Sequence, residues 1–148
     1  MRLREVETHF YWHGSDKKGL KELIPQESEL VGRKVVFAAT YPEIAVAMAE
    51  HWSDETDFKF GRTMKKSDDP EQVPYTLREK REGAFEEFFS DPISLYEVDG
   101  KSFHPDKNIQ DFEVVSNKTV KVLEEHRIEH PLDYLHKSRM VKLKTYSS

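Results

Sequence analysis

The most restrictive feature of this sequence is the short spacing between successive strand-like stretches in its C-terminal half. The stretch 93–98 ends at the turn pair Asp99-Gly100, and the stretches 112–116 and 119–123 are separated only by Asn117-Lys118. Parallel neighbouring strands need a crossover of a dozen or more residues, whereas antiparallel strands can be joined by a tight turn. The spacing therefore predicts an α+β domain with a mainly antiparallel sheet, and not a doubly wound parallel sheet.

The N-terminal half adds two strands and one helix to this prediction. An aromatic stretch at 8–13 and a continuous apolar run at 35–38 are both typical of strands. Thr40-Tyr41-Pro42-Glu43 has the pattern of a capping box with proline in the first turn, and apolar residues then recur at helical spacing. We therefore expect an amphipathic helix over 41–53. Four further segments are expected as a helical turn at 19–24, a long loop or insertion at 54–75, a helix at 76–89 and a short helix within 127–137.

Length and composition indicate one folded domain. The chain has 148 residues, of which 36% are hydrophobic and 34% charged. Its 9 Phe, 6 Tyr and 2 Trp supply enough large apolar side chains for a core, which a disordered chain would lack. We find no internal repeat and no linker, so residues 1–148 are expected to form a single domain.

Charge and cysteine content exclude several classes of function. The formal net charge is −5, and acidic and basic residues are interspersed, so no dedicated nucleic-acid surface is evident. The absence of cysteine excludes disulfides, thiolate metal sites and a cysteine nucleophile. No apolar stretch approaches the ~20 residues that span a membrane, and no signal-peptide core follows the first residues. These features predict a cytoplasmic protein without a membrane partner.

Three short motifs, taken in order, are the candidates for chemistry. His13-Gly14-Ser15 follows an aromatic strand, Phe37-Ala38 ends an apolar strand that leads into the 41–53 helix, and Glu113 begins the strand 112–116. Each has an ordinary structural interpretation by itself: a turn histidine, core packing and a solvent-facing carboxylate. It is their order and combination that indicate a function.

This combination resembles the ADP-ribosyltransferase-like superfamily, in the branch that includes poly(ADP-ribose) polymerases and diphtheria-type toxins. In that branch a strand ends in a His-Gly-Ser/Thr element, a second strand ends in Phe-Ala before a helix, and a catalytic Glu begins a late strand. The resemblance covers roughly residues 8–123. It implies the ADP-ribosyltransferase-like fold, a mainly antiparallel split sheet with flanking helices.

The resemblance also implies a reaction and a role for each matched residue. NAD would be the substrate, and cleavage of its nicotinamide–ribose bond passes through an oxocarbenium-like state. Glu113 would hydrogen-bond the ribose and stabilise the developing positive charge, and His13 would hydrogen-bond a ribose hydroxyl with Ser15 assisting. Gly14 would present its backbone to the nicotinamide amide. Tyr41 or Tyr11 is a candidate to replace the ring that stacks on the nicotinamide in that branch. No metal is implied.

Two functions remain open from the sequence. The first is a mono-ADP-ribosyltransferase or NAD glycohydrolase, with an acceptor protein or other macromolecule that the sequence does not name. The second is a non-catalytic module on the same fold that binds a nucleotide or a protein, because the stacking tyrosines of the branch fall at Val36 and near Ala47. His126 and His130 have a spacing compatible with a metal on a helix, but no third ligand is evident, so we interpret them as surface residues.

Overall fold

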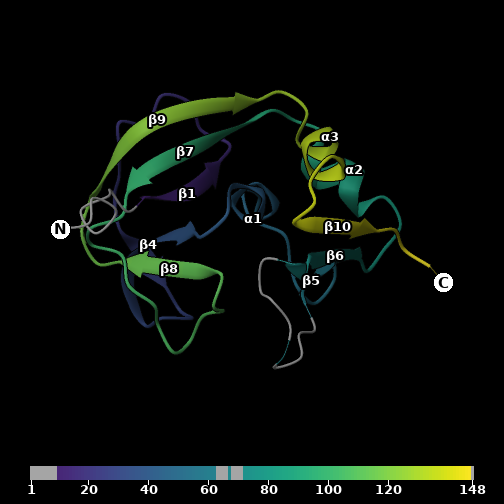
Figure 1. Cartoon of the computed structure of the whole chain (residues 1–148), viewed down its shortest axis with the longest axis horizontal. Coiled ribbons are helices and arrows are strands. Elements are labelled where there is room, and N and C mark those ends of the chain that lie inside the picture. The colour runs from purple at the N-terminus through teal and green to yellow at the C-terminus, as the bar shows by residue number, and fades with distance from the viewer. Residues whose placement is uncertain (1–9, 63–66, 68–71, 148) are drawn as a thin grey trace.

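The computed structural model of the chain describes residues 10–62, 67 and 72–147 (Figure 1). This part contains three short helices, and most of its residues lie in strands or in the loops between them. The helices are α1 (Pro42–Ala47), α2 (Ala84–Phe89) and α3 (Pro131–His136). The strands are β1 (Phe10–Ser15), β2 (Glu22–Leu23), β3 (Gln26–Ser28), β4 (Arg33–Ala39), β5 (Phe58–Gly61), β6 (Tyr75–Glu79), β7 (Ile93–Asp99), β8 (Glu113–Ser116), β9 (Val120–Ile128) and β10 (Val141–Lys144).

The main sheet is seven-stranded and antiparallel, in the order β2-β9-β7-β1-β4-β3, with β8 also paired to β4. β1 is paired with β7 over its whole length, but only one pair of residues, Trp12 and Ala39, joins β1 to β4. The sheet is therefore continuous on one side of β1 and splits on the other. This split lies directly beside His13.

The α+β class and the predominance of antiparallel pairing are confirmed. The strands near 8–13, 35–38, 93–98 and 112–116 are present, although residues 8 and 9 lie outside the described part. The strand expected at 119–123 is longer than predicted and forms most of β9. β8 and β9 are close in sequence but do not pair with each other: β8 pairs with β4, and β9 pairs with β7 and β2. The three-residue link 117–119 therefore joins a strand on one side of β1 in the sheet order to a strand on the other side.

The predicted helix over 41–53 is shorter than expected, and its capping box is wrong. α1 ends at Ala47, and its N-cap residue Tyr41 makes no side-chain cap hydrogen bond. The hydroxyl and backbone N–H of Thr40 instead donate to the carbonyl of Phe112, 3.3 and 3.0 Å away. Thr40 therefore binds the end of β4 to Phe112, the residue before Glu113. This tertiary contact replaces the local capping contact that the sequence pattern predicted.

Three other predictions were wrong in secondary structure. The segment 19–24 contains the strand β2 and no helical turn. The loop expected at 54–75 contains β5, while its residues 63–66 and 68–71 lie outside the described part. The helix expected at 76–89 is a strand, β6, followed by the shorter helix α2. Gly83, in the left-handed region at φ 88°, separates the two. The short helix expected within 127–137 is present as α3.

A second, three-stranded sheet lies apart from the main one, with the order β10-β6-β5. In Figure 1 α1 lies between the main sheet and the part of the molecule that holds this small sheet, α2 and α3. The largest cluster of buried side chains joins these parts and includes Ile44 and Val46 of α1, Phe58 of β5 and Leu77 of β6. One face of the small sheet is therefore fixed against the core.

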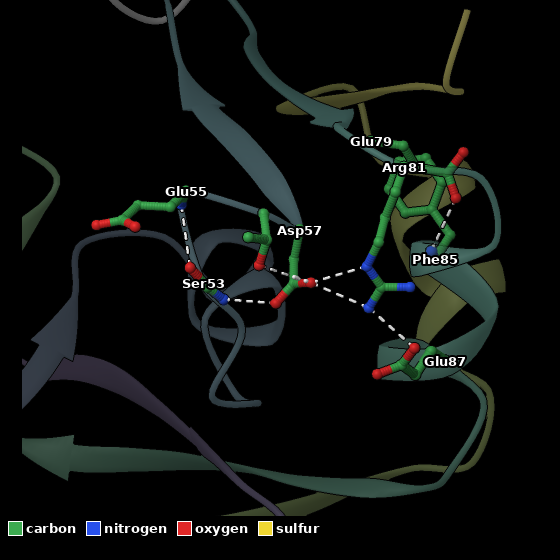
Figure 2. A network of polar contacts seen from close by, with 8 residues as sticks. Ser53, Glu55, Asp57, Glu79, Arg81, Phe85 and Glu87 are labelled. Atoms are coloured by element: carbon green, nitrogen blue, oxygen red, sulfur yellow. Dashed lines mark hydrogen bonds and ion pairs between the residues drawn. The ribbon is translucent and has the colours of Figure 1, made fainter.

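Two buried carboxylates hold the small sheet to its neighbours (Figure 2). Asp57 accepts from the backbone N–H of Ser53 at 2.7 Å and from Arg81 at 3.0 Å, and Arg81 also pairs with Glu87 of α2. Glu79 accepts from the N–H of Phe85 at the start of α2. Because a buried carboxylate without donors would be costly, these contacts fix the segment before β5 and the segment after β6.

Candidate functional site

His13 lies in β1 at the split of the main sheet. Its Nδ1 is 2.7 Å from the carbonyl oxygen of Phe37 in β4. A carbonyl oxygen can only accept, so Nδ1 carries the hydrogen. Burial lowers the pKa of His13, with the bond to Phe37 acting in the opposite direction. A ring with a lowered pKa is neutral at pH 7, and its Nε2 then presents a lone pair as a hydrogen-bond acceptor.

The His13 ring bridges the gap between β1 and β4. Hydrogen bonds of a sheet run between the strands, so a side chain that donates to a strand carbonyl lies beside that strand and not above it. The ring takes the place of the backbone ladder that would otherwise continue beyond the Trp12–Ala39 pair. Within the described residues no hydrogen bond or ion pair involves Nε2 of His13.

Glu113 is the first residue of β8 and is half-buried. Its backbone N–H donates to the carbonyl of Gln110, while no contact in the described part of the chain engages its carboxylate. Burial raises the pKa of the Glu113 carboxyl group. A carboxylate that is partly removed from water and has no donor is a feature that folding alone does not require.

The pairing register sets the faces from which these two side chains leave the sheet. Glu113 is opposite Ala39, and Ala39 is opposite Trp12, so these three share one face. His13 follows Trp12 and is opposite Tyr96, so its side chain leaves toward the other face. The two candidate residues therefore lie on opposite faces of the sheet, His13 beside the split and Glu113 one strand beyond it. If the two residues lined one cleft in a regular sheet, we would expect their side chains to project side by side from neighbouring strands, and they do not.

Gly14 has a different role from the one that the resemblance implied. A Cβ at Gly14 would lie 2.3 Å from the carbonyl oxygen of Ala45 and 2.8 Å from the side chain of Ala49. The close approach that this glycine allows is thus the approach of α1 to β1. A ligand cannot reach the Gly14 backbone from that face, and only its backbone groups in the plane of the sheet remain as possible contacts.

The remaining predicted site residues lie around the same strand ends. Ser15 shares the face of His13, and its hydroxyl accepts from the backbone N–H of Lys17 at 3.1 Å. Tyr41 is half-buried before α1 and packs against the main core cluster. Val36 and Ala47 are buried aliphatic residues that are 4% and 0% exposed, so neither position supplies an aromatic surface.

Trp12 is the aromatic residue near the split that sequence reasoning did not single out. It is half-buried, lies on the face of Glu113, and directly precedes His13. Its ring contacts Phe10 edge-on and lies 6.1 Å from the His126 ring. The alternation of β1 could have assigned Trp12 to the face opposite His13, but only the pairing with β4 and β8 places it with Glu113.

One group in the described residues has the side chains for a metal ion: Glu97, Glu124 and His126, whose ligand atoms lie within 4.8 Å of one another. His126 belongs to β9 and not to a helix, and His130 is the N-cap residue of α3, so the helical pairing of these two histidines does not occur. Nε2 of His126 is 3.1 Å from Glu97 and 3.2 Å from Glu124. The three side chains therefore contact one another directly across β7 and β9.

Two hollows of the surface lie away from the split. One lies on the small sheet, and a second, of about 160 Å³, lies between the end of α2 and the start of α3. Neither is lined by His13 or Glu113. In the described part of the chain, no helix has both the length and the apolar character needed to span a bilayer.

Comparisons with known proteins give no relative from which a role could be carried over. The chain matches no protein-family model, no curated protein and no solved structure. The inferences that follow therefore rest on the residues and their geometry.

Proposed function

We propose that the protein binds NAD at the split between β1 and β4 and cleaves its nicotinamide–ribose bond, either by transfer of ADP-ribose to an acceptor or by hydrolysis. The single observation that carries this proposal is that two side-chain groups near the split, on opposite faces of the sheet, have no partner among the described residues. They are Nε2 of His13, held by the bond from Nδ1 to Phe37, and the half-buried carboxylate of Glu113, which belongs to the same row as the Trp12–Ala39 pair.

The two groups have complementary abilities toward a ribose. A neutral His13 accepts a hydrogen bond from a hydroxyl group through Nε2, and a carboxylate at Glu113 accepts a second one. Glu113 also places a negative charge near the carbon that becomes positively charged as the nicotinamide leaves. Because the pKa of Glu113 is raised by burial, its charge lies in a medium of low polarity, where it interacts strongly with such a centre.

A ligand that used both residues would lie across the split. His13 and Glu113 leave opposite faces of the sheet, so they can reach one molecule only where the sheet is interrupted. The interruption begins beyond the Trp12–Ala39 pair. Trp12, on the face of Glu113, then provides the aromatic surface that Val36 and Ala47 do not supply.

The second candidate function is a non-catalytic module on the same scaffold that binds a nucleotide. The opposite faces of His13 and Glu113 favour it, because binding can use His13 alone whereas the reaction needs both side chains at one ribose. The two functions differ in one respect that can be measured. Both predict NAD binding that depends on His13, but only the enzyme predicts turnover that depends on Glu113.

Calorimetric titration of the full chain with NAD tests the shared part. We expect binding to the native protein and to Glu113→Gln with similar affinity, because glutamine keeps an acceptor and the shape. We expect weaker binding to His13→Asn, which keeps a donor near Nδ1 but has no atom at Nε2. Loss of one uncharged hydrogen bond corresponds to roughly 2- to 12-fold in affinity. Absence of NAD binding to the native chain at millimolar concentration would contradict both functions.

A further inference from the structure

We propose that the outer face of the small sheet is a binding site for a chain of phosphate groups, separate from the split of the main sheet. The site is a hollow of about 380 Å³ lined by residues of β5, β6 and β10 and by the residue that follows β5. These residues are Lys59, Gly61, Arg62, Thr76, Arg78 and Lys144. Four of the six are cations and none is acidic, although the chain as a whole has a net charge of −5.

Three of the cations form one row across the sheet. Arg78 in the middle strand is directly opposite Lys59 in β5 and directly opposite Lys144 in β10. Directly paired residues share a face, so the three side chains project together. All three are exposed, and no hydrogen bond or ion pair to another described residue engages their charged groups. Like charges at paired positions destabilise a sheet, so the row requires a reason other than folding.

Gly61 gives an independent indication of a ligand. It lies in the next row of the same face, opposite Thr76. Its φ is not positive, and a Cβ built on it would meet nothing within 4 Å. Gly61 is the last residue of β5, and neither its backbone conformation nor its packing calls for glycine. A remaining reason for such a glycine is close approach of a ligand to the backbone.

The chemistry of the lining selects phosphate over other anions. The cation row crosses three strands, which are ~4.8 Å apart, so it extends over ~10 Å and can meet more than one charged group. Arg78 can present a guanidinium fork to phosphate oxygens, lysines supply compact charges, and the Thr76 hydroxyl can donate. No aromatic residue lines the hollow, so it offers no surface on which bases could stack.

Arg62 links the hollow to the rest of the fold. Its guanidinium lies 4.3 Å from the centre of the Tyr75 ring, donates to the carbonyl of Val73, and is 3.8 Å from the carboxylate of Asp111. Because Tyr75 belongs to the buried face of the small sheet, these contacts draw the guanidinium of Arg62 away from the outer face, and the cations that face the hollow are the three of the row. The opposite face of the small sheet is fixed by the core, with Tyr75, Leu77 and Val141 all 2% exposed or less. The site is thus built on a rigid support.

Titration calorimetry with tripolyphosphate tests the proposal on the full chain. We expect binding whose affinity falls as salt is raised. The double variant Arg78→Gln with Lys144→Gln should bind at least about tenfold more weakly, because two charge-assisted contacts are lost. Gly61→Val, which suits a strand and projects into open space, should also weaken binding while the melting temperature is kept.

A matched control separates a built site from general charge. Lys101→Gln with Lys121→Gln changes the net charge equally at two exposed residues outside the hollow and should leave the affinity unchanged. Equal losses in the two double variants, or no binding of tripolyphosphate to the native chain, would overturn the proposal.

A second arm identifies the source of the phosphates. A short oligothymidylate that competes with tripolyphosphate would show that a nucleic-acid backbone can supply them, and an oligothymidylate that does not compete would indicate a small phosphate compound. An oligothymidylate that binds while tripolyphosphate does not would overturn the site as proposed. None of these outcomes depends on NAD cleavage, because no residue of the cation row belongs to the proposed NAD site.

Discussion

The Nδ1 atom of His13 lies 2.7 Å from the carbonyl oxygen of Phe37, at the point where β1 and β4 cease to pair. The His13 side chain thus takes the place of a backbone hydrogen bond between the two strands. This contact fixes both the orientation of the imidazole and its tautomer, because the carbonyl can only accept. The expectations for the site follow from Nε2, which remains as a hydrogen-bond acceptor.

The first prediction concerns this contact. His13→Asn should keep most of the stability of the native protein, because its amide can still donate to the carbonyl of Phe37. His13→Ala should be less stable than His13→Asn by about 1–3 kcal/mol, since it leaves a buried acceptor without its donor. Chemical denaturation of the three proteins measures the difference. Equal stability of the asparagine and alanine variants would show that the bond does not hold the split.

The second prediction concerns Gly14. Gly14→Ala should destabilise the fold by about 1–3 kcal/mol, because the new methyl group would lie 2.3 Å from the carbonyl oxygen of Ala45. Gly61→Ala is the matched control. Its methyl group meets nothing, and a less flexible unfolded chain should leave stability unchanged or raise it by about 0.4–1 kcal/mol. Thermal melts of both variants test the prediction, and a Gly14→Ala variant as stable as the native chain would contradict the packing of α1 on β1.

The third prediction concerns the charge of Glu113. Burial raises the pKa of this group in the folded state, so its ionised form opposes folding at neutral pH, and this cost disappears as pH falls through the raised pKa. Glu113→Gln should therefore melt above the native protein at pH 7 and closer to it at pH 4. A gain of about 0.5–2 kcal/mol is typical when such a group is neutralised, with about 2–4 °C for each kcal/mol. A variant that melts lower at pH 7 would mean that Glu113 has a stabilising partner.

The fourth prediction concerns acid sensitivity. The N–H of Ser53, followed by Arg81, lowers the pKa of Asp57, so its contribution to stability is present at neutral pH. That contribution is lost as pH falls below ~3.9 toward the lower folded value. Asp57→Asn should melt below the native protein at pH 7, and the difference between their melting temperatures should be smaller at pH 3. A difference of the same size at both pH values would show that the charge of Asp57 does not stabilise the fold.

The local sequence pattern was sufficient to predict the strands that have strong apolar or aromatic runs. The segments around His13, Val36 and Val115 were predicted because such runs have few alternatives to a strand. The segment 76–89 was not, because Leu77, Phe85 and Phe89 fit a helical period even though Tyr75–Glu79 alternates. The turn at Gly83 and the partners β5 and β10 decide between the two. The prediction of a capping box at Thr40 was wrong for a related reason, because the partner of Thr40, Phe112, is distant in sequence.

The sequence proposes candidate residues for the site but not their arrangement. His13 and Glu113 were selected by their order in the chain, whereas the faces that they occupy depend on the register of β1, β4 and β8, which no local pattern encodes. The cation row was missed for the same reason. Lys59, Arg78 and Lys144 come from three segments whose pairing aligns them, and each lies among other charged residues in the sequence.

The most direct test of the proposed function is nicotinamide release from NAD by the native chain and by Glu113→Gln, measured over hours with and without cell lysate as a source of acceptor. The transition state gains positive charge at the ribose, so the variant should bind NAD nearly normally yet release nicotinamide about 100- to 1,000-fold more slowly. Equal rates for an active native protein and the variant would contradict the role of Glu113. Background rates for both, together with measurable NAD binding, would contradict catalysis and leave the non-catalytic module.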